Sequence, residues 1–304
     1  MSNKELCGIL NINKPRGVTS HDVVARVRKI TGQRKVGHAG TLDPLATGVL
    51  LLCLGQATRV AEYLAASDKV YRTRLRLGIS TDTYDAEGQI TSQSEVAVSR
   101  DQVEQALQAF IGIQEQMPPM YSAIKRDGIP LYRLARRGQV VPRQMRKVEI
   151  YDIRLLTWEP PELEIEVSCS KGTYIRSLVH DLGQRLGCGA HLVSLTRIAS
   201  GQFRVEDAIT LEELEQACAR GTVASLLHPL DMALQSFLAI TVDLATEHRI
   251  VSGQRVRLSN AIEGTLCRAY AADGRLLALL RLDREGLWQP HKVFAQGRGN
   301  EDHP

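Results

Sequence analysis

The stretch GHAGTLDPLATGVLLL, residues 37–52, places one carboxylate, Asp43, between a glycine-containing turn and an apolar run. Two interpretations are open. Aspartate is favoured at helix N-caps and proline at the first helical position, so Asp43 and Pro44 predict a helix start. Alternatively, the turn presents a reactive carboxylate at the edge of a buried strand over residues 48–55. On these residues alone the helix start is favoured.

Regular patterns on both sides of this stretch predict strands and helices in alternation. Thr19 and Asp22 form a capping box before a helix that ends at Gly32. Residues 69–79 alternate, with Tyr71 on the apolar side of the predicted strand. Further strands are predicted over 7–13, 147–159, 162–170 and 189–203, and further helices over 56–67, 100–111, 173–187 and 211–221.

Near residue 235 the sequence pattern changes to short predicted strands separated by glycine turns. We therefore expect a first domain over 1–235, a small β-rich domain over 236–295 and a disordered tail over 296–304. The predicted fold class is α/β of the α+β kind: a mixed, mainly antiparallel sheet flanked by helices, followed by the β-rich domain.

The basic residues are concentrated in two segments. Residues 1–40 carry eight Lys or Arg against two acids, and residues 120–147 carry eight against one, although the whole chain has a net charge of only +4. This distribution predicts a phosphate-rich partner, with a solvated basic face as the alternative. The insertion over about 118–147 is broken by prolines and glycines, which suggests a loop that orders on binding.

Composition and cysteine use exclude several classes of protein. The chain has no apolar run of 18 residues, so we expect no membrane span. Its N-terminus lacks the apolar stretch of a signal peptide. Six cysteines form no CxxC pair, and no His/Cys cluster has zinc spacing. These features predict a cytoplasmic protein with reduced thiols and no metal.

Five motifs together carry a family resemblance: NKPRGVTSHDVV (13–24), GHAGTLDPLATGVL (37–50), SDKVYRTRLRLG (67–78), PPMYSAIKRDGIPLYRLAR (118–136) and CSKGTYIRSLVHDLG (169–183). In this order and spacing the chain resembles the TruB family of bacterial tRNA pseudouridine synthases. The resemblance runs from about Gly8 to about Gly201. The C-terminal region is more loosely similar to a PUA-type RNA-binding domain.

The resemblance implies an isomerase that converts uridine 55 in the T-arm of tRNA to pseudouridine. The reaction breaks the N1–C1′ bond of a flipped-out uridine and rejoins the base through C5, without cofactor or metal. It implies Asp43 as the catalytic residue and Arg176 as its partner, which we expect to form a forked ion pair. It further implies Tyr71, Tyr174 and Leu195 as walls of the base pocket.

The remaining residues implied by the family contact RNA. His38 matches a histidine that contacts the RNA. Lys14 belongs to the KPxG motif; we count it among the RNA-binding residues, although the motif in the family mainly supports the active-site loops. The basic insertion adds further predicted RNA contacts: Lys125, Arg126, Arg133, Arg136 and Arg137.

The ordinary alternatives to these roles are structural. Tyr71 and Leu195 also suit plain core positions, and Arg176 suits a helix surface. Two other functions remain open: a non-catalytic RNA-binding or tRNA-folding module, and a metal-dependent hydrolase that uses Asp43 or the carboxylates Asp82 and Asp85. We expect a monomer that binds the T-arm of tRNA.

Overall fold

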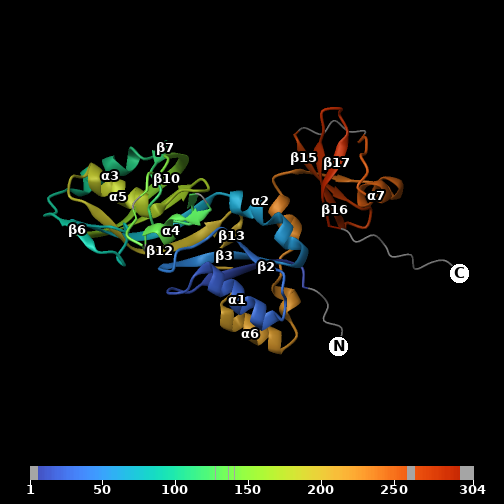
Figure 1. The fold of residues 1–304 in the computed structure, drawn as a ribbon, viewed down its shortest axis with the longest axis horizontal. Coiled ribbons are helices and arrows are strands. Elements are labelled where there is room, and N and C mark those ends of the chain that lie inside the picture. The colour runs from blue at the N-terminus through green and yellow to red at the C-terminus, as the bar shows by residue number, and fades with distance from the viewer. Residues whose placement is uncertain (1–5, 127, 136, 140, 259–263, 295–304) are drawn as a thin grey trace.

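The computed structural model describes residues 6–126, 128–135, 137–139, 141–258 and 264–294. Its largest element is a nine-stranded mixed sheet of order β1-β3-β12-β4-β11-β10-β7, with β2 added to β3 and β13 to β12 (Figure 1). Among the described strands of this sheet only β3 and β12 pair in parallel. The predicted fold class, a mainly antiparallel sheet with helices, is therefore confirmed.

The strands of this sheet are β1 (Gly8–Lys14), β2 (Val36–Ala39), β3 (Ala46–Leu54), β4 (Lys69–Leu77), β7 (Gly112–Gln116), β10 (Arg146–Glu159), β11 (Glu162–Cys169), β12 (Ala190–Ser200) and β13 (Phe203–Arg204). A separate hairpin consists of β5 (Ile79–Thr81) and β6 (Ile90–Gln93).

Helices cover the sheet, and several begin where their capping residues predict. They are α1 (Ser20–Thr31), α2 (Ala61–Ala66), α3 (Arg100–Gln108), α5 (Ile175–Arg185) and α6 (Leu211–Ala219), with the short helices η1 (Gly55–Val60), η2 (Val223–Leu226) and η3 (Leu230–Leu234). Thr19 and Asp22 form the expected capping box of α1, and Gly32 ends that helix in the left-handed conformation.

Strand β3 is apolar along its whole length because both of its faces are buried. Leu50 and Leu52 pack in the cluster that includes α1 and α5, whereas Val49 and Leu51 pack in the cluster that includes η1 and α2. A continuous apolar run is typical of a strand covered on both sides. The carboxylate in front of it therefore lies at the edge of the most buried part of the molecule.

Strand β4 shows the predicted alternation, with Tyr71 buried and the three arginines Arg72, Arg74 and Arg76 exposed. The arginines do not form a free basic patch. Each makes an ion pair with a glutamate of the neighbouring strand β11, at Glu162, Glu164 or Glu166. Cross-strand pairs of opposite charge stabilise this face of the sheet and neutralise it.

The predicted helix start at Asp43 and Pro44 is wrong. Asp43 opens a turn in which its carbonyl accepts from the amide of Ala46 at 3.0 Å, and β3 begins at Ala46 itself. Residues 48–54 pair with β1 and residues 46–48 pair with β12, so the cap preference yields to sheet formation. The carboxylate is thereby free of a capping role.

The C-terminal β domain contains a four-stranded sheet of β14 (Leu238–Thr241), β15 (Leu266–Tyr270), β16 (Leu276–Leu282) and β17 (Trp288–Val293). It also contains α7 (Leu244–Val251), a helix that the sequence analysis missed although Asp243 caps it. Figure 1 shows this unit beyond α2, at one end of the molecule. Leu279 and Phe294 pack in the same cluster as Val60 and Leu64, which joins the two parts. The predicted tail over 296–304 lies outside the described residues.

The basic segment over 118–147 contains regular structure rather than only an irregular loop. It contains a short hairpin of β8 (Lys125–Arg126) and β9 (Ile129–Pro130), followed by α4 (Leu131–Ala135). Leu131 and Leu134 are buried, so α4 is packed down on one side.

Candidate active site

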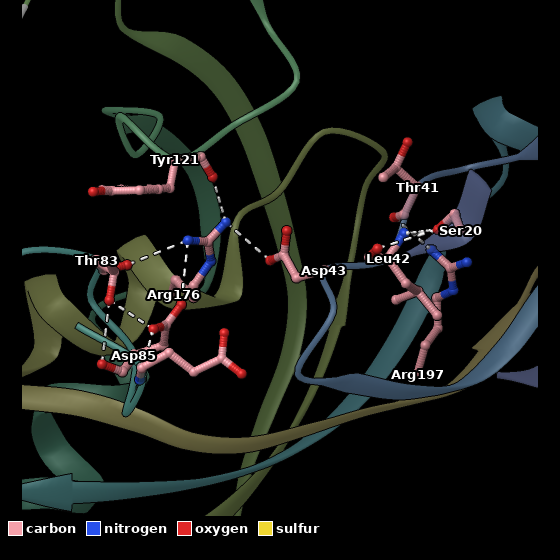
Figure 2. Close-up of polar contacts among 10 residues, drawn as sticks. Ser20, Thr41, Leu42, Asp43, Thr83, Asp85, Tyr121, Arg176 and Arg197 are labelled. Atoms are coloured by element: carbon pink, nitrogen blue, oxygen red, sulfur yellow. Dashed lines mark hydrogen bonds and ion pairs between the residues drawn. The ribbon is translucent and has the colours of Figure 1, made fainter. Parts of the chain in front are cut away.

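Every residue of the loop from Gly40 to Pro44 is held by a neighbouring element, so Asp43 stands on a rigid turn. Figure 2 shows Thr41, Leu42 and Asp43 of this loop with their partners. The Ser20 hydroxyl, at the start of α1, bonds both the amide and the carbonyl of Leu42, at 2.9 and 3.1 Å. The carbonyl of Pro44 accepts from the amide of Gly17 at 2.8 Å. The Asp43 side chain keeps 35% of its surface exposed, which leaves it accessible to a ligand.

Arg176 brings two carboxylates and two main-chain carbonyls onto one guanidinium. Its Nη2 lies 2.9 Å from Oδ2 of Asp43 and donates to the Tyr121 carbonyl at 2.6 Å, whereas Nη1 lies 3.3 Å from both Oδ2 of Asp85 and the Thr83 carbonyl. The arginine is only 4% exposed. Sequence reasoning correctly paired Arg176 with Asp43. The expected fork is wrong, because one nitrogen meets one oxygen of Asp43, Nη1 serves Thr83 and Asp85, and Nε has no hydrogen-bond partner among the described residues.

The pKa of Asp43 is raised above its ordinary value of 3.8, chiefly because burial penalises its charge. Arg176 opposes the rise, and the nearby charge of Asp85 adds to it. Removal of water also strengthens the ion pair, so the carboxylate is both held and less hydrated than one in solution. A carboxylate in this state is suited to attack, or to take a proton, at a carbon that develops positive charge.

Tyr71 and Leu195 reach the site because β12 lies between β3 and β4. Leu195 pairs with Ala46 of β3 on one side and with Thr73 of β4 on the other, and Tyr71 is the next inward residue of β4. Both side chains are buried. Burial raises the pKa of the Tyr71 hydroxyl, and the charge of Asp43 contributes to the rise, so the two groups lie within electrostatic reach.

Tyr174 stands directly in front of α5, two residues before Arg176. Its amide donates to the side-chain oxygen of Gln116 at 2.7 Å, and its carbonyl accepts from the same side chain at 3.0 Å. Burial raises the pKa of its hydroxyl, and Asp43 again contributes. The structure thus gathers the predicted pocket residues around Asp43.

Lys14 does not contact the exterior, so its prediction as an RNA-binding residue is corrected. The side chain is fully buried at the end of β1. Its ammonium donates to the carbonyls of Pro15, Val18 and Pro44, at 2.8, 2.7 and 3.3 Å. Burial lowers the pKa of Lys14 to about 8. The residue supports the active-site loop, as the KPxG motif of the family implied.

His38 lies on β2, half-buried, with its ring 5.1 Å from that of His21 and nearly perpendicular to it. Burial lowers the pKa of His38, and the charges of His21 and Arg197 act in the same direction. The ring is therefore held neutral at physiological pH, as an uncharged donor or acceptor at the edge of the site.

The predicted basic contacts lie on the segment that covers Arg176. Arg133 and Arg137 are exposed, and so is Arg126, whose guanidinium donates to the Pro142 carbonyl at 3.1 Å. The side chain of Lys125 and the whole of Arg136 lie outside the described residues. Since Tyr121 of the same segment bonds Arg176, the basic residues adjoin the candidate active site.

Sequence reasoning missed two residues that organise the site. Asp85 was considered only as a metal ligand, but its carboxylate accepts from the Thr83 hydroxyl at 2.6 Å and from the amide of Glu87 at 3.1 Å, besides pairing with Arg176. Arg197, on β12, was not considered at all. The available signal was the alternation of that strand, which places residue 197 on the same inward face as Leu195.

Among the described residues, no group of three His, Cys, Asp or Glu side chains is arranged to hold a metal ion. No described helix is long and apolar enough to cross a membrane.

The site consists of a partly exposed aspartate on a fixed loop, its arginine partner and two tyrosines beside a basic segment, and comparison with known proteins assigns it to a class of RNA-modifying enzymes. Residues 28–175 match the N-terminal domain of the TruB family of pseudouridylate synthases, and residues 176–235 match the C-terminal domain of tRNA pseudouridylate synthase B. The chain belongs to the TruB family of pseudouridylate synthases.

Similar proteins cover almost the whole chain. A tRNA pseudouridine synthase B of Pseudomonas aeruginosa is 45% identical over 294 residues, which span 96% of this chain and 97% of that one. One from Dehalococcoides mccartyi is 44% identical over 288 residues, 94% of this chain and 96% of that one. Among solved structures, the Cbf5–Nop10–Gar1 complex contains a chain with a TM-score of 0.74 and 28% identity, matching 95% of this chain and 85% of that one. An H/ACA RNP bound to a substrate RNA gives the same TM-score at 26% identity, with the same two coverages.

Proposed function

We propose that this chain converts the uridine at position 55 in the T-arm of tRNA to pseudouridine, with Asp43 as the catalytic carboxylate. The observation that carries the proposal is the ion pair of 2.9 Å between Arg176 and a partly exposed Asp43. Membership of the TruB family supplies the reaction, and the intact set of Asp43, Tyr71 and Arg176 argues for an enzyme rather than a binding module alone.

The geometry assigns each group a task. A T-loop uridine is stacked in folded tRNA, so it must leave the stack to reach Asp43. Tyr71, Tyr174 and Leu195 supply aromatic and apolar surface for the flipped base. Asp43 then acts at the sugar as the N1–C1′ bond breaks and its electron pair stays on the base. The base turns and bonds C1′ through C5, after which C5 loses its hydrogen as a proton and N1 gains one. Arg176 holds the carboxylate in place throughout the reaction.

The decisive experiment is incubation of the purified protein with unmodified tRNA transcript, followed by mapping of pseudouridine. We expect modification at position 55, with unchanged yield in the presence of a chelator. Product at another position would correct the substrate, and no product on any tRNA would refute the enzyme and favour the non-catalytic RNA-binding module.

A metal-dependent hydrolase is the less favoured function because Arg176 occupies the space between the two carboxylates. Asp43 and Asp85 both bind this guanidinium, and the remaining bonds of Asp85 go to Thr83 and Glu87. A divalent cation would have to displace a buried arginine. Loss of activity with a chelator, restored by a metal, would reverse this preference.

Activity should fall as the pH drops through the raised pKa of Asp43, because only the ionised carboxylate is reactive. The acid limb of the single-turnover rate should therefore have its midpoint above 3.8, the ordinary value for aspartate. The measurement is the rate at saturating tRNA between about pH 4 and 8, with circular dichroism at each pH to confirm folding. A rate that stays constant down to pH 4 would contradict the raised pKa.

Neutralising Arg133 and Arg137 by glutamine should weaken tRNA binding and flatten its salt dependence. Each lost phosphate contact should reduce the slope of log affinity against log salt by about 0.7 to 0.9. The rate on bound tRNA should change much less, because phosphate contacts position the RNA without touching the base. Filter binding over a range of salt concentrations provides the measurement.

The matched control is a pair of exposed arginines that glutamates already neutralise. Arg74 and Arg76 are about half exposed and pair with Glu162 of β11. Changing both to glutamine should leave the salt slope unchanged. Equal effects of the two double variants would show that the segment over 118–147 is an ordinary solvated face, and that tRNA is held elsewhere.

We further propose that the enzyme acts as a monomer in the cytoplasm, where its substrate is found, and that the domain over 236–295 is a PUA-type module that holds RNA. The β-rich C-terminal sheet supports this last proposal. Removing the chain from residue 236 onward exposes the cluster around Leu234, so single surface substitutions on β15–β17 are the better test.

A further inference from the structure

Arg197 is a buried cation that no carboxylate neutralises among the described residues. It lies in β12 and is 1% exposed. Its guanidinium donates to three main-chain carbonyls: Nε to Val49 at 2.7 Å, Nη2 to Gly40 at 3.0 Å and Nη1 to Thr41 at 3.5 Å. Burial of a charge is costly, and buried charges are normally paired with an opposite one. A residue that departs from this rule inside an active site calls for a reason.

The three carbonyls belong to the two ends of the segment that carries Asp43. Gly40 and Thr41 lie before the carboxylate, and Val49 lies after it in β3. Ser20 holds the middle of the loop through Leu42, and Arg197 holds the start of the loop, at Gly40 and Thr41 (Figure 2). Displacement of a reacting group by about 1 Å costs about a hundredfold in rate, so this anchoring bears directly on Asp43.

On its other side, Arg197 faces the tyrosine of the base pocket. In the β12–β4 register Arg197 stands opposite Tyr71, and in the β12–β3 register it stands opposite Gly48. Directly paired residues on one face have their Cβ atoms about 5 Å apart. The main chains of β3 and β12 approach closely at this point: Gly48 has a φ of +94°, and a Cβ there would lie 2.3 Å from the carbonyl oxygen of Arg197.

The charge of Arg197 acts on the Tyr71 hydroxyl. Burial raises the pKa of Tyr71, and the guanidinium opposes that rise. Lys14 offers a contrast, because it is equally buried and also holds the Asp43 loop, through Pro44, but it does not stand opposite Tyr71. A comparison of variants at Lys14 and Arg197 therefore distinguishes the effect of anchoring the loop from an effect on the Tyr71 hydroxyl.

We propose that Arg197 is a positioning residue of the isomerisation, which couples the Asp43 loop to the Tyr71 hydroxyl and keeps an unneutralised positive charge behind the base. The role rests on the proposed function. When the N1–C1′ bond breaks, its electron pair stays on the uracil, which becomes an anion until C5 forms its bond to C1′. A fixed positive charge one side chain away stabilises that anion and costs no reorganisation.

The test is a double-mutant cycle between Arg197→Met and Tyr71→Phe, read as the single-turnover rate of pseudouridine formation at saturating tRNA. Arg197→Met should lower the rate by about a hundredfold in the parent. In the Tyr71→Phe background the same change should lower it by less than about tenfold, because the hydroxyl that stands between the charge of Arg197 and the base is gone. Lys14→Met, the matched control, should have the same fold effect in both backgrounds.

Two results would overturn the proposal: parental turnover by Arg197→Met, or an equal effect of that change in both backgrounds. If Arg197→Met does not give a folded protein by circular dichroism, the same cycle is run with Arg197→Lys, which keeps the charge but loses the three-carbonyl contact. Because the charge beside Tyr71 is kept and only the loop contacts are lost, Arg197→Lys should lower the rate by the same factor in both backgrounds. A smaller effect in the Tyr71→Phe background would show that the coupling runs through the carbonyl contacts rather than the charge, and would refute the proposal. The proposed function is tested separately, by pseudouridine formation in the parent protein, and does not depend on the outcome of the cycle.

Discussion

Replacing Asp43 by asparagine is expected to reduce pseudouridine formation to less than about a hundredth of the parental rate. The substitution keeps the shape of the side chain but removes its charge and its nucleophilic oxygen. The loop around it depends on Ser20, Arg197 and Gly17 rather than on the carboxylate. The loss should therefore appear in the chemical step, with tRNA affinity kept within about tenfold.

The same variant should keep or raise the melting temperature. Because burial raises the folded-state pKa of Asp43, the ionised form is less favourable in the folded chain than in the unfolded one. The stabilising contribution of this group is therefore present at low pH and is lost as the pH rises through its raised pKa. At neutral pH an asparagine carries no charge and so avoids this unfavourable burial of an ionised group. Active-site residues commonly lower stability in this way in exchange for activity.

Asp101→Asn is the control, since it changes an exposed aspartate in the first turn of α3, far along the chain from the site. It should retain the parental rate. Residual turnover of Asp43→Asn above about a hundredth of that rate would show that another group performs the chemistry. A large loss of tRNA binding would instead assign Asp43 to substrate recognition.

Local sequence patterns predicted much of the fold because the physical constraints that they express are local. Thr19 and Asp22 satisfy the first amides of α1 whatever the rest of the chain does. The alternation around Tyr71 places a polar and an apolar face on β4 before any partner strand is known. The motif resemblance then located Asp43, Tyr71 and Arg176, which the structure brings together.

The errors arose where tertiary contacts override a local preference. Asp43 and Pro44 favour a helix start, but pairing of the following residues with β1 is worth more. Lys14 was expected at the RNA, yet three carbonyls at a loop crossing hold it inside the protein. The alternation of β12 could have placed Arg197 on the inward face, but its position beside Gly48 is known only from the structure. The same holds for Asp85, which the loop before β6 brings to Arg176.

Arg176→Lys is the second change with a large expected effect, although it preserves the charge. The guanidinium reaches Asp43, Asp85, Thr83 and Tyr121 with two separated nitrogens. A single ammonium cannot satisfy acceptors that lie on opposite sides of the planar group. We expect the single-turnover rate to fall by about a hundredfold, with a smaller change in tRNA affinity.

Arg185→Lys is the matched control, because Arg185 lies exposed in the last turn of the same helix. It should behave as the parent. Normal turnover by Arg176→Lys would mean that the pairing of Arg176 with Asp43 does not contribute to catalysis.

Arg176→Ala should be less active and less stable than the lysine variant, because it leaves two carboxylates near each other without a cation. A buried charge that loses its partner destabilises the fold by about 3 to 5 kcal/mol. The destabilisation from the buried Asp85 should lie within this range, and that from the partly exposed Asp43 below it. Adding Asp85→Asn removes the more deeply buried of the two charges. The double variant should thus recover part of the melting temperature while remaining inactive, since Asp43 still lacks its partner. Recovery of activity together with stability would show that Arg176 serves the fold and that Asp43 positions itself.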